Sequence, residues 1–331
     1  MFLAHIHNFR AYAIIGIVGA HTLHAFQWND HPYVFNLFDT LFNQSSVLFF
    51  FIAGFMFQYL SPRYEMWSYW RKKLRNVITP YLILSVPAII YYTQFAYQDN
   101  TWTGFYDNPW YEQVFFFLIT GKHLAPFWFV PTIAIFYVFA PLLVKADRDR
   151  RIYWFLPLFM AISFYLGRDG SLGPINKAAY LFSVYLFGMF ASVYHDELLA
   201  VVKRYQWSIL AFVIVLVVGN TLNTEYARYV QYVLKVTLCP LLLFYFDRIE
   251  HVLGDRFSYI AHISFGIFFI HAYVLPVVKI LYLQLSGNEA FPEGNVLGYL
   301  LATAAVLGGC TLIIWICQKV TGKYSRMILG A

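Results

Sequence analysis

The first apolar segment of the chain carries side chains that could do chemistry. Arg10 and His21 lie eleven positions apart in this segment, and His24 follows three residues later. On an α-helix, eleven residues make three turns plus about 20°, so Arg10 and His21 share one face and stand roughly 16 Å apart along the axis. Polar side chains inside a membrane helix are costly and usually point into the protein or into a wet cavity. We therefore expect this face to be buried or functional.

The two side chains allow proton transfer at His21 and anion binding at Arg10, about half a bilayer apart. A buried imidazole is favoured in its neutral form, which accepts a proton as a general base must. A guanidinium stays charged and binds anions such as phosphate. We therefore take His21 as a candidate base and Arg10 as a candidate anion anchor. The simpler alternatives are that His21 hydrogen-bonds to a neighbouring helix and that Arg10 extends to the membrane surface.

The elements that must position these side chains are membrane helices. Of the 331 residues, 60% are hydrophobic and only 12% are charged, whereas a soluble domain is about 25% charged. Several apolar runs reach the roughly 20 residues that cross a hydrocarbon layer of ~30 Å. We therefore predict an all-α fold, a polytopic transmembrane helical bundle. Its expected spans, about ten, are residues 9–28, 36–60, 76–97, 126–145, 152–166, 178–195, 206–222, 229–247, 258–284 and 295–319.

The positions of Lys and Arg predict the orientation of these spans. With a cytoplasmic N-terminus, the outer segments hold only Lys122, Arg168, Lys177 and Arg228 of the 23 basic residues. Cytoplasmic loops of membrane proteins are enriched in Lys and Arg, so both termini are expected in the cytoplasm. The same distribution explains the net charge of +6 without a nucleic-acid partner.

Further candidate side chains lie outside the first segment. The basic run "RKKLR" (Arg71–Arg75) suits phosphate groups, although cytoplasmic loops are basic in any case. His271, in a long apolar run, could complete a site opposite His21 or bond to a buried backbone group. The histidines of "HIH" (His5–His7) have no carboxylate or cysteine nearby in the sequence, so we predict no metal site.

Several stretches, taken in order, resemble one known family. Besides the spacing of Arg10 and His21, they are "FFFIAGFMF" (49–57), "RKKLRNVITPYLI" (71–83), "FWFVP" (127–131) and "HISFGIFFIHAYVL" (262–275). Together they are similar to the acyltransferase-3 family of integral membrane acyltransferases, over nearly the whole chain. One departure is Ala53, because the family usually has Ser before the glycine at Gly54.

The resemblance implies a membrane O-acyltransferase of the bacterial cytoplasmic (inner) membrane. It implies transfer of an acyl group, usually acetyl, from acyl-CoA (acetyl-CoA) on the cytoplasmic side to a hydroxyl of an exported or cell-envelope polysaccharide, an exopolysaccharide for example, or of its lipid-linked precursor. Acyl-CoA would be a substrate, with no permanently bound cofactor. Residues 1–331 are expected to form a single domain without the periplasmic domain that some members carry. The expected partners are the donor, the glycan, the lipid bilayer and other glycan-assembly proteins.

The same resemblance extends to individual residues. His21 and Arg10 are expected in catalysis. The expected contacts to CoA phosphates are Arg71, Lys72, Lys73 and Arg75. The candidate acceptor contacts are His24, His271 and Trp128. His24 could instead lie near the outer interface with Trp28, and packing near the site is the favoured role of Trp128.

A non-enzymatic glycan or lipid translocator is the alternative function. Ten spans and the aromatic and polar outer segment 97–113 would suit it, since such segments contact sugars but also form interfacial aromatic belts. A translocator has no need of acyl-CoA, so donor binding discriminates between the two functions.

Overall fold

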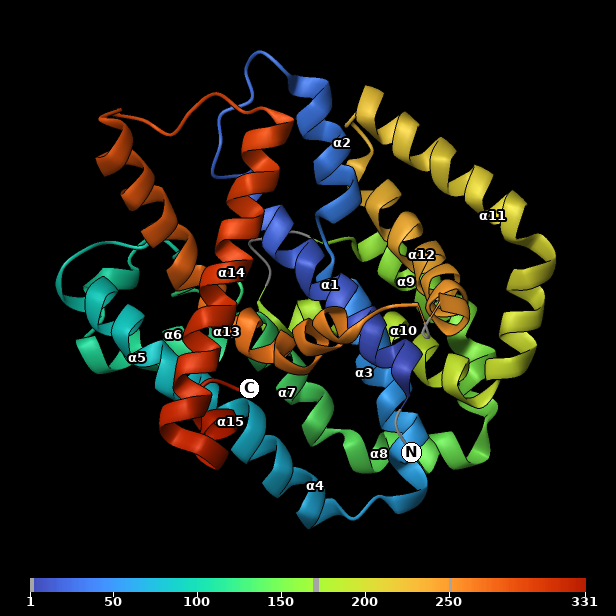
Figure 1. Ribbon diagram of the computed structural model, residues 1–331. Helices are drawn as coiled ribbons and strands as arrows, with labels where there is room; N and C mark the ends of the chain where they lie inside the picture. Colours follow the sequence, from blue (N-terminus) through green and yellow to red (C-terminus); the bar gives the residue numbers. More distant parts are fainter. Residues whose placement is uncertain (1–2, 169–172, 250–251) are drawn as a thin grey trace.

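The chain folds into a bundle of α-helices (Figure 1), described by a computed structural model for residues 3–168, 173–249 and 252–331. Those residues contain no β-strand, so the all-α prediction is confirmed. The helices are α1 (Ala4–Leu23), α2 (Pro32–Phe42), α3 (Ser46–Leu60), α4 (Met66–Lys73), α5 (Thr79–Gln94), α6 (Trp110–Thr120), α7 (Phe129–Val138), α8 (Ala140–Asp149), α9 (Leu156–Leu166), α10 (Pro174–Val193), α11 (His195–Leu222), α12 (Ala227–Ile249), α13 (Asp255–Ser286), α14 (Val296–Thr321) and α15 (Ser325–Ile328).

Long apolar helices make the chain a multi-pass membrane protein. Within the described residues, six helical stretches are long and apolar enough to cross a membrane, or seven if the bent pair α7 and α8 is one span. The other expected spans coincide with α1, α10 and the shorter apolar helix 151–166. Helices α1 and α10 are largely buried, so they meet protein more than lipid and need not be uniformly apolar. The count of ten spans and the cytoplasmic termini stay predictions.

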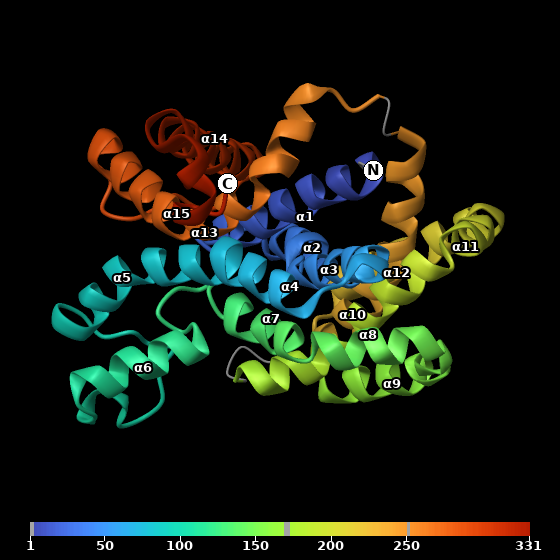
Figure 2. The ribbon, with the colours of Figure 1, turned by 90° about the horizontal axis from the view of Figure 1, so that it is seen from below.

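Helix α1 lies at the centre of the bundle and packs along α13 (Figures 1 and 2). His7 donates from Nε2 to the Ser258 carbonyl at 2.8 Å, and the His21 and His271 rings are 5.2 Å apart between centroids. The contacts advance in the same direction along both helices, so α1 and α13 are parallel. This agrees with the expected topology, in which spans 9–28 and 258–284 cross in the same direction.

Two glycines hold α3 and α10 together at backbone distance. A Cβ atom on Gly54 would lie 1.9 Å from the Tyr185 carbonyl oxygen, and one on Gly188 would lie 2.0 Å from the Phe51 carbonyl oxygen. Small residues allow such close approach of membrane helices. The glycine of "FFFIAGFMF" therefore serves helix packing.

We expect Gly54→Ala to lower the thermal unfolding temperature of the purified protein. The added methyl group must push the two backbones apart, and overpacking of this kind costs about 1–3 kcal/mol. Gly219→Ala is the matched control, because no atom from outside its own stretch of helix lies within 4 Å of the position that a Cβ would take, and alanine favours helix by about 1 kcal/mol. A Gly54→Ala protein as stable as Gly219→Ala would contradict the proposed packing role.

Candidate active site

Helix α1 ends earlier than the sequence suggests, and this changes the position of His21. The expected span was 9–28, but α1 is Ala4–Leu23, which puts His21 in its last turn. The apolar residues that follow do not extend the helix. Trp28 donates from Nε1 to the Leu23 carbonyl at 3.0 Å and packs with Phe26 in a small separate core. The chain therefore turns after Leu23 and leaves the His21 imidazole near an opening.

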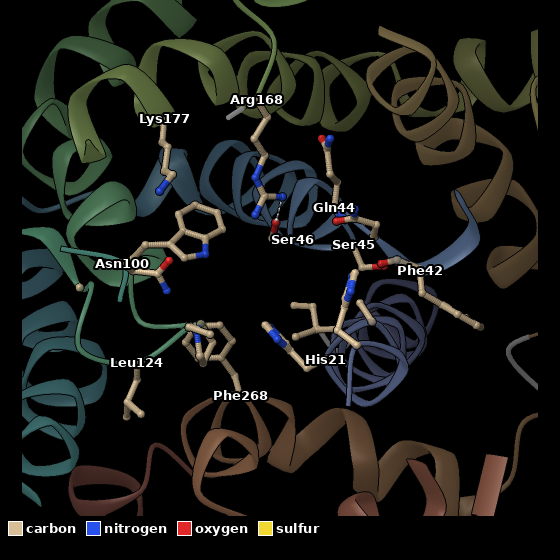
Figure 3. A pocket seen from close by; sticks show the side chains of 18 of the residues that line it. His21, Phe42, Gln44, Ser45, Ser46, Asn100, Leu124, Arg168, Lys177 and Phe268 are labelled. Atoms are coloured by element: carbon tan, nitrogen blue, oxygen red, sulfur yellow. Dashed lines mark hydrogen bonds between the residues drawn. The ribbon is translucent and has the colours of Figure 1, made fainter. Parts of the chain in front are cut away.

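His21 lines a cavity of about 300 Å³ (Figure 3). His24 and Trp128 line the same cavity, as do Ala20 of α1 and Phe268 of α13. Four further lining residues come from segments that the sequence predicts to face outward: Asn100, Lys122, Arg168 and Lys177. The cavity is thus on the predicted outer side of the protein.

One wall of the cavity is a break in a helix that the sequence predicts to be continuous. The expected span 36–60 lies within the stretch 32–63 that is long and apolar enough to cross a membrane, but residues 43–45 interrupt its helix and divide it into α2 and α3. Gln44 has a positive φ of 57°, and its Oε1 accepts a hydrogen bond from the Tyr180 hydroxyl at 2.9 Å. Irregular backbone at membrane depth is tolerated where it is buried in protein or lines a cavity. The signal that could have located this wall is the polar run "NQSS" (43–46) between apolar residues.

An adjoining wall combines an aromatic ring with two cations. The Arg168 guanidinium and the Lys177 ammonium lie 4.6 Å and 5.0 Å from the centre of the Trp128 ring. Arg168 also donates from Nη1 to the Ser46 hydroxyl at 3.1 Å, the hydrogen bond drawn as a dashed line in Figure 3, and so connects this wall to the 43–46 segment. The sequence assigned Arg168 and Lys177 only to outer loops, and nothing local in it distinguishes them from other loop cations. Together these groups make a polar surface suited to hydroxyl-rich ligands.

His271 lies directly behind His21. Its side chain is buried, and Nδ1 donates to the Ile267 carbonyl at 3.0 Å. In a neutral ring Nε2 then carries the lone pair, and this atom is buried without a hydrogen-bond partner among the described residues. The alternative that His271 bonds to buried backbone is therefore confirmed, and the ring also neighbours His21, while its part in a site opposite His21 stays a prediction. His24 is different: its half-exposed ring lies 3.3 Å from Asp39 Oδ1.

The other end of α1 carries a cluster of positive charges. Arg10 donates from Nη2 to the Ser264 hydroxyl at 3.1 Å, so it faces α13 as His21 does, and the predicted shared face is confirmed. Arg10, Lys73 and Arg326 lie close enough to repel one another electrostatically. Within the described part of the chain no carboxylate forms an ion pair with any of the three. We call these residues the basic cluster.

The basic run "RKKLR" divides between two surfaces. Lys73 belongs to the basic cluster, and its ammonium lies 4.7 Å from the centre of the Tyr137 ring. Arg71 and Arg75 instead line a surface groove of about 880 Å³ that also contains Trp67 and Met327. Lys72 is exposed. The groove and the basic cluster adjoin at α15, through Met327 and Arg326 of that short helix.

The fold and the two ends of α1 define a class: a multi-pass membrane protein with an imidazole in a polar cavity and a basic cluster on the opposite side. Comparison with protein families identifies the group within this class. A family model described as an acyltransferase domain matches residues 3–315. The chain belongs to this acyltransferase-3 family, as predicted from its motifs. No curated protein and no solved structure matches the chain.

Proposed function

We propose that the protein is an O-acyltransferase of the bacterial cytoplasmic membrane. It would transfer an acyl group, acetyl in the simplest case, from cytoplasmic acyl-CoA to a hydroxyl of an exported or cell-envelope polysaccharide or of its lipid-linked precursor. The observation that carries the proposal is that the two ends of α1 contribute to two different sites. Its first half contributes Arg10 to the basic cluster, and its last turn presents His21 to the polar cavity. Membership of the acyltransferase-3 family supports the reaction class.

The donor would bind at the basic cluster. Coenzyme A carries several phosphate groups, and Arg and Lys bind phosphate through charge-assisted hydrogen bonds. The cluster offers three cations without a carboxylate partner in the described chain, so a polyanion would relieve their mutual repulsion. The neighbouring groove, with Arg71, Arg75 and the indole of Trp67, would suit the nucleotide end of the donor.

The acceptor would enter the cavity on the other side. In the proposed step His21 removes the proton from the acceptor hydroxyl as its oxygen attacks the thioester carbonyl. The new C–O bond forms and the C–S bond breaks. The CoA sulfur leaves as a thiolate, takes the proton back from His21 and becomes the free thiol. The lone pair on His271 Nε2 would accept the N–H of His21 and so keep the other nitrogen of His21 available as the base.

We expect His271→Ala to lower kcat on the order of 10–100-fold with little change in KM for either substrate, because it acts by positioning His21. His271→Gln is the informative companion, since its side-chain oxygen can accept the same N–H and should restore part of the activity. Equal losses in the two variants would indicate that His271 serves packing alone.

Direct measurement of donor and product tests the proposed function. Purified protein should bind acetyl-CoA, and cells that express it should gain O-acyl esters on envelope polysaccharide, seen by NMR of the isolated glycan. A strain that lacks the gene should lose these esters while it still exports glycan. Loss of export with no change in ester content, together with no binding of acetyl-CoA, would favour the translocator and contradict the acyltransferase.

A further inference from the structure

Three side chains that commonly bind metals meet at the start of α1. They are His5 of α1, His195 at the beginning of α11, and Asp247 near the end of α12, and their candidate ligand atoms all lie within 4.8 Å of one another. His5 Nδ1 is 3.8 Å from Asp247 Oδ1. Figure 2 shows the beginning of α1 beside α12. The three residues are far apart in the sequence, and none of them takes part in the proposed acyl transfer.

The orientation of His195 is set by its own neighbour. Its Nδ1 lies 3.1 Å from Asp196 Oδ1 and donates to that carboxylate. The proton on Nδ1 leaves the lone pair on Nε2, which is buried and has no hydrogen-bond partner in the described part of the chain. Histidines that bind metals usually donate their other ring N–H to a carboxylate or carbonyl in this way.

The surroundings of the three side chains suit an ion. The Phe55 ring stands edge-on to both imidazoles, with centroids 6.3 Å from His5 and 6.0 Å from His195, and closes one side with apolar surface. On the other side the Asp247 side chain is 39% exposed. The group is therefore open to an ion from solvent on the Asp247 side and is shielded from water by the Phe55 ring on the other.

We propose that His5, His195 and Asp247 bind one divalent transition-metal ion with the ligand preferences of zinc. Two imidazole nitrogens and one carboxylate oxygen are a common zinc donor set, with water in the fourth position. Bonds of about 2.0–2.2 Å place tetrahedral ligand atoms roughly 3.3–3.6 Å apart, so the side chains need to close by up to about 1.5 Å. The ion would tie the first turn of α1 to α11 and α12, and so hold in place the helix that carries Arg10 and His21.

Metal binding to the full-length purified protein tests the proposal. After a chelator has removed bound metal, Zn²⁺ should bind with one ion per chain by calorimetry and raise the unfolding temperature, and Co²⁺ should give visible ligand-field absorption. His195→Ala and Asp247→Asn should each weaken Zn²⁺ binding at least tenfold and abolish the thermal shift. Asp196→Asn should weaken binding about tenfold, because it acts only through His195.

The matched control is His31→Ala, which removes an exposed imidazole at the start of α2 and should bind Zn²⁺ as the unaltered protein does. A protein that binds no Zn²⁺ after stripping would overturn the proposal. So would Zn²⁺ binding that survives unchanged in Asp247→Asn, since this near-isosteric variant keeps the packing even if His195→Ala does not fold.

Discussion

Replacement of His21 by alanine is expected to reduce acyl transfer by about 10²–10⁴-fold, the usual contribution of a general base. His21 is the imidazole of α1 that both lines the polar cavity and neighbours the buried ring of His271. The variant should leave acetyl-CoA binding within about twofold of the unaltered protein, because the basic cluster lies at the other end of the helix. Ester content of the envelope polysaccharide by NMR and direct binding of acetyl-CoA measure the two effects separately.

The design separates catalysis from folding. His31→Ala makes the same chemical change at an exposed position and should keep full activity. His21→Gln keeps a polar side chain of similar reach without a basic ring nitrogen, and it should be as inactive as His21→Ala. A folded His21→Ala protein that still esterifies the glycan at the normal rate would exclude His21 as the base.

The sequence was sufficient for the parts of the fold that follow from local periodicity. Apolar runs located each described helical stretch that is long and apolar enough to cross a membrane. The helical repeat put Arg10 and His21 on one face, which the contacts to Ser264 and His271 confirm. Both inferences depend only on residues close together in the chain, where geometry is set by the helix itself.

The rest of the candidate site depends on contacts between distant segments. Gln44 has its unusual φ where the Tyr180 hydroxyl of α10 bonds to it, and Arg168 gains its role from a tryptophan 40 residues earlier and from Ser46. The apolar run also predicted too late an end for α1. Trp28 does not extend the helix, because it packs in a core with α14 residues such as Tyr299. In each case tertiary packing decided between local conformations that the sequence alone allows.

The second large expected effect concerns the basic cluster. Removing one of its charges should weaken the binding of acetyl-CoA without lowering the stability of the protein. Arg10→Gln and Lys73→Gln should each weaken acetyl-CoA binding by about 10–100-fold, because a hydrogen bond to a charged group contributes about 1.5–3 kcal/mol. The same changes should leave the unfolding temperature unchanged or raise it, since each removes one of three like charges that repel one another. Calorimetric binding and thermal unfolding of the ligand-free protein measure the two quantities.

This opposition distinguishes a binding site from a structural feature. Replacing a residue that stabilises the fold lowers the stability of the protein. Replacing one of several like charges that are held together for a ligand raises it, because the repulsion between them falls. Lys203→Gln is the control, an exposed basic residue on α11 for which neither quantity should change. If Arg10→Gln and Lys73→Gln destabilise the protein and leave acetyl-CoA affinity intact, the basic cluster serves the fold, and the donor must bind elsewhere.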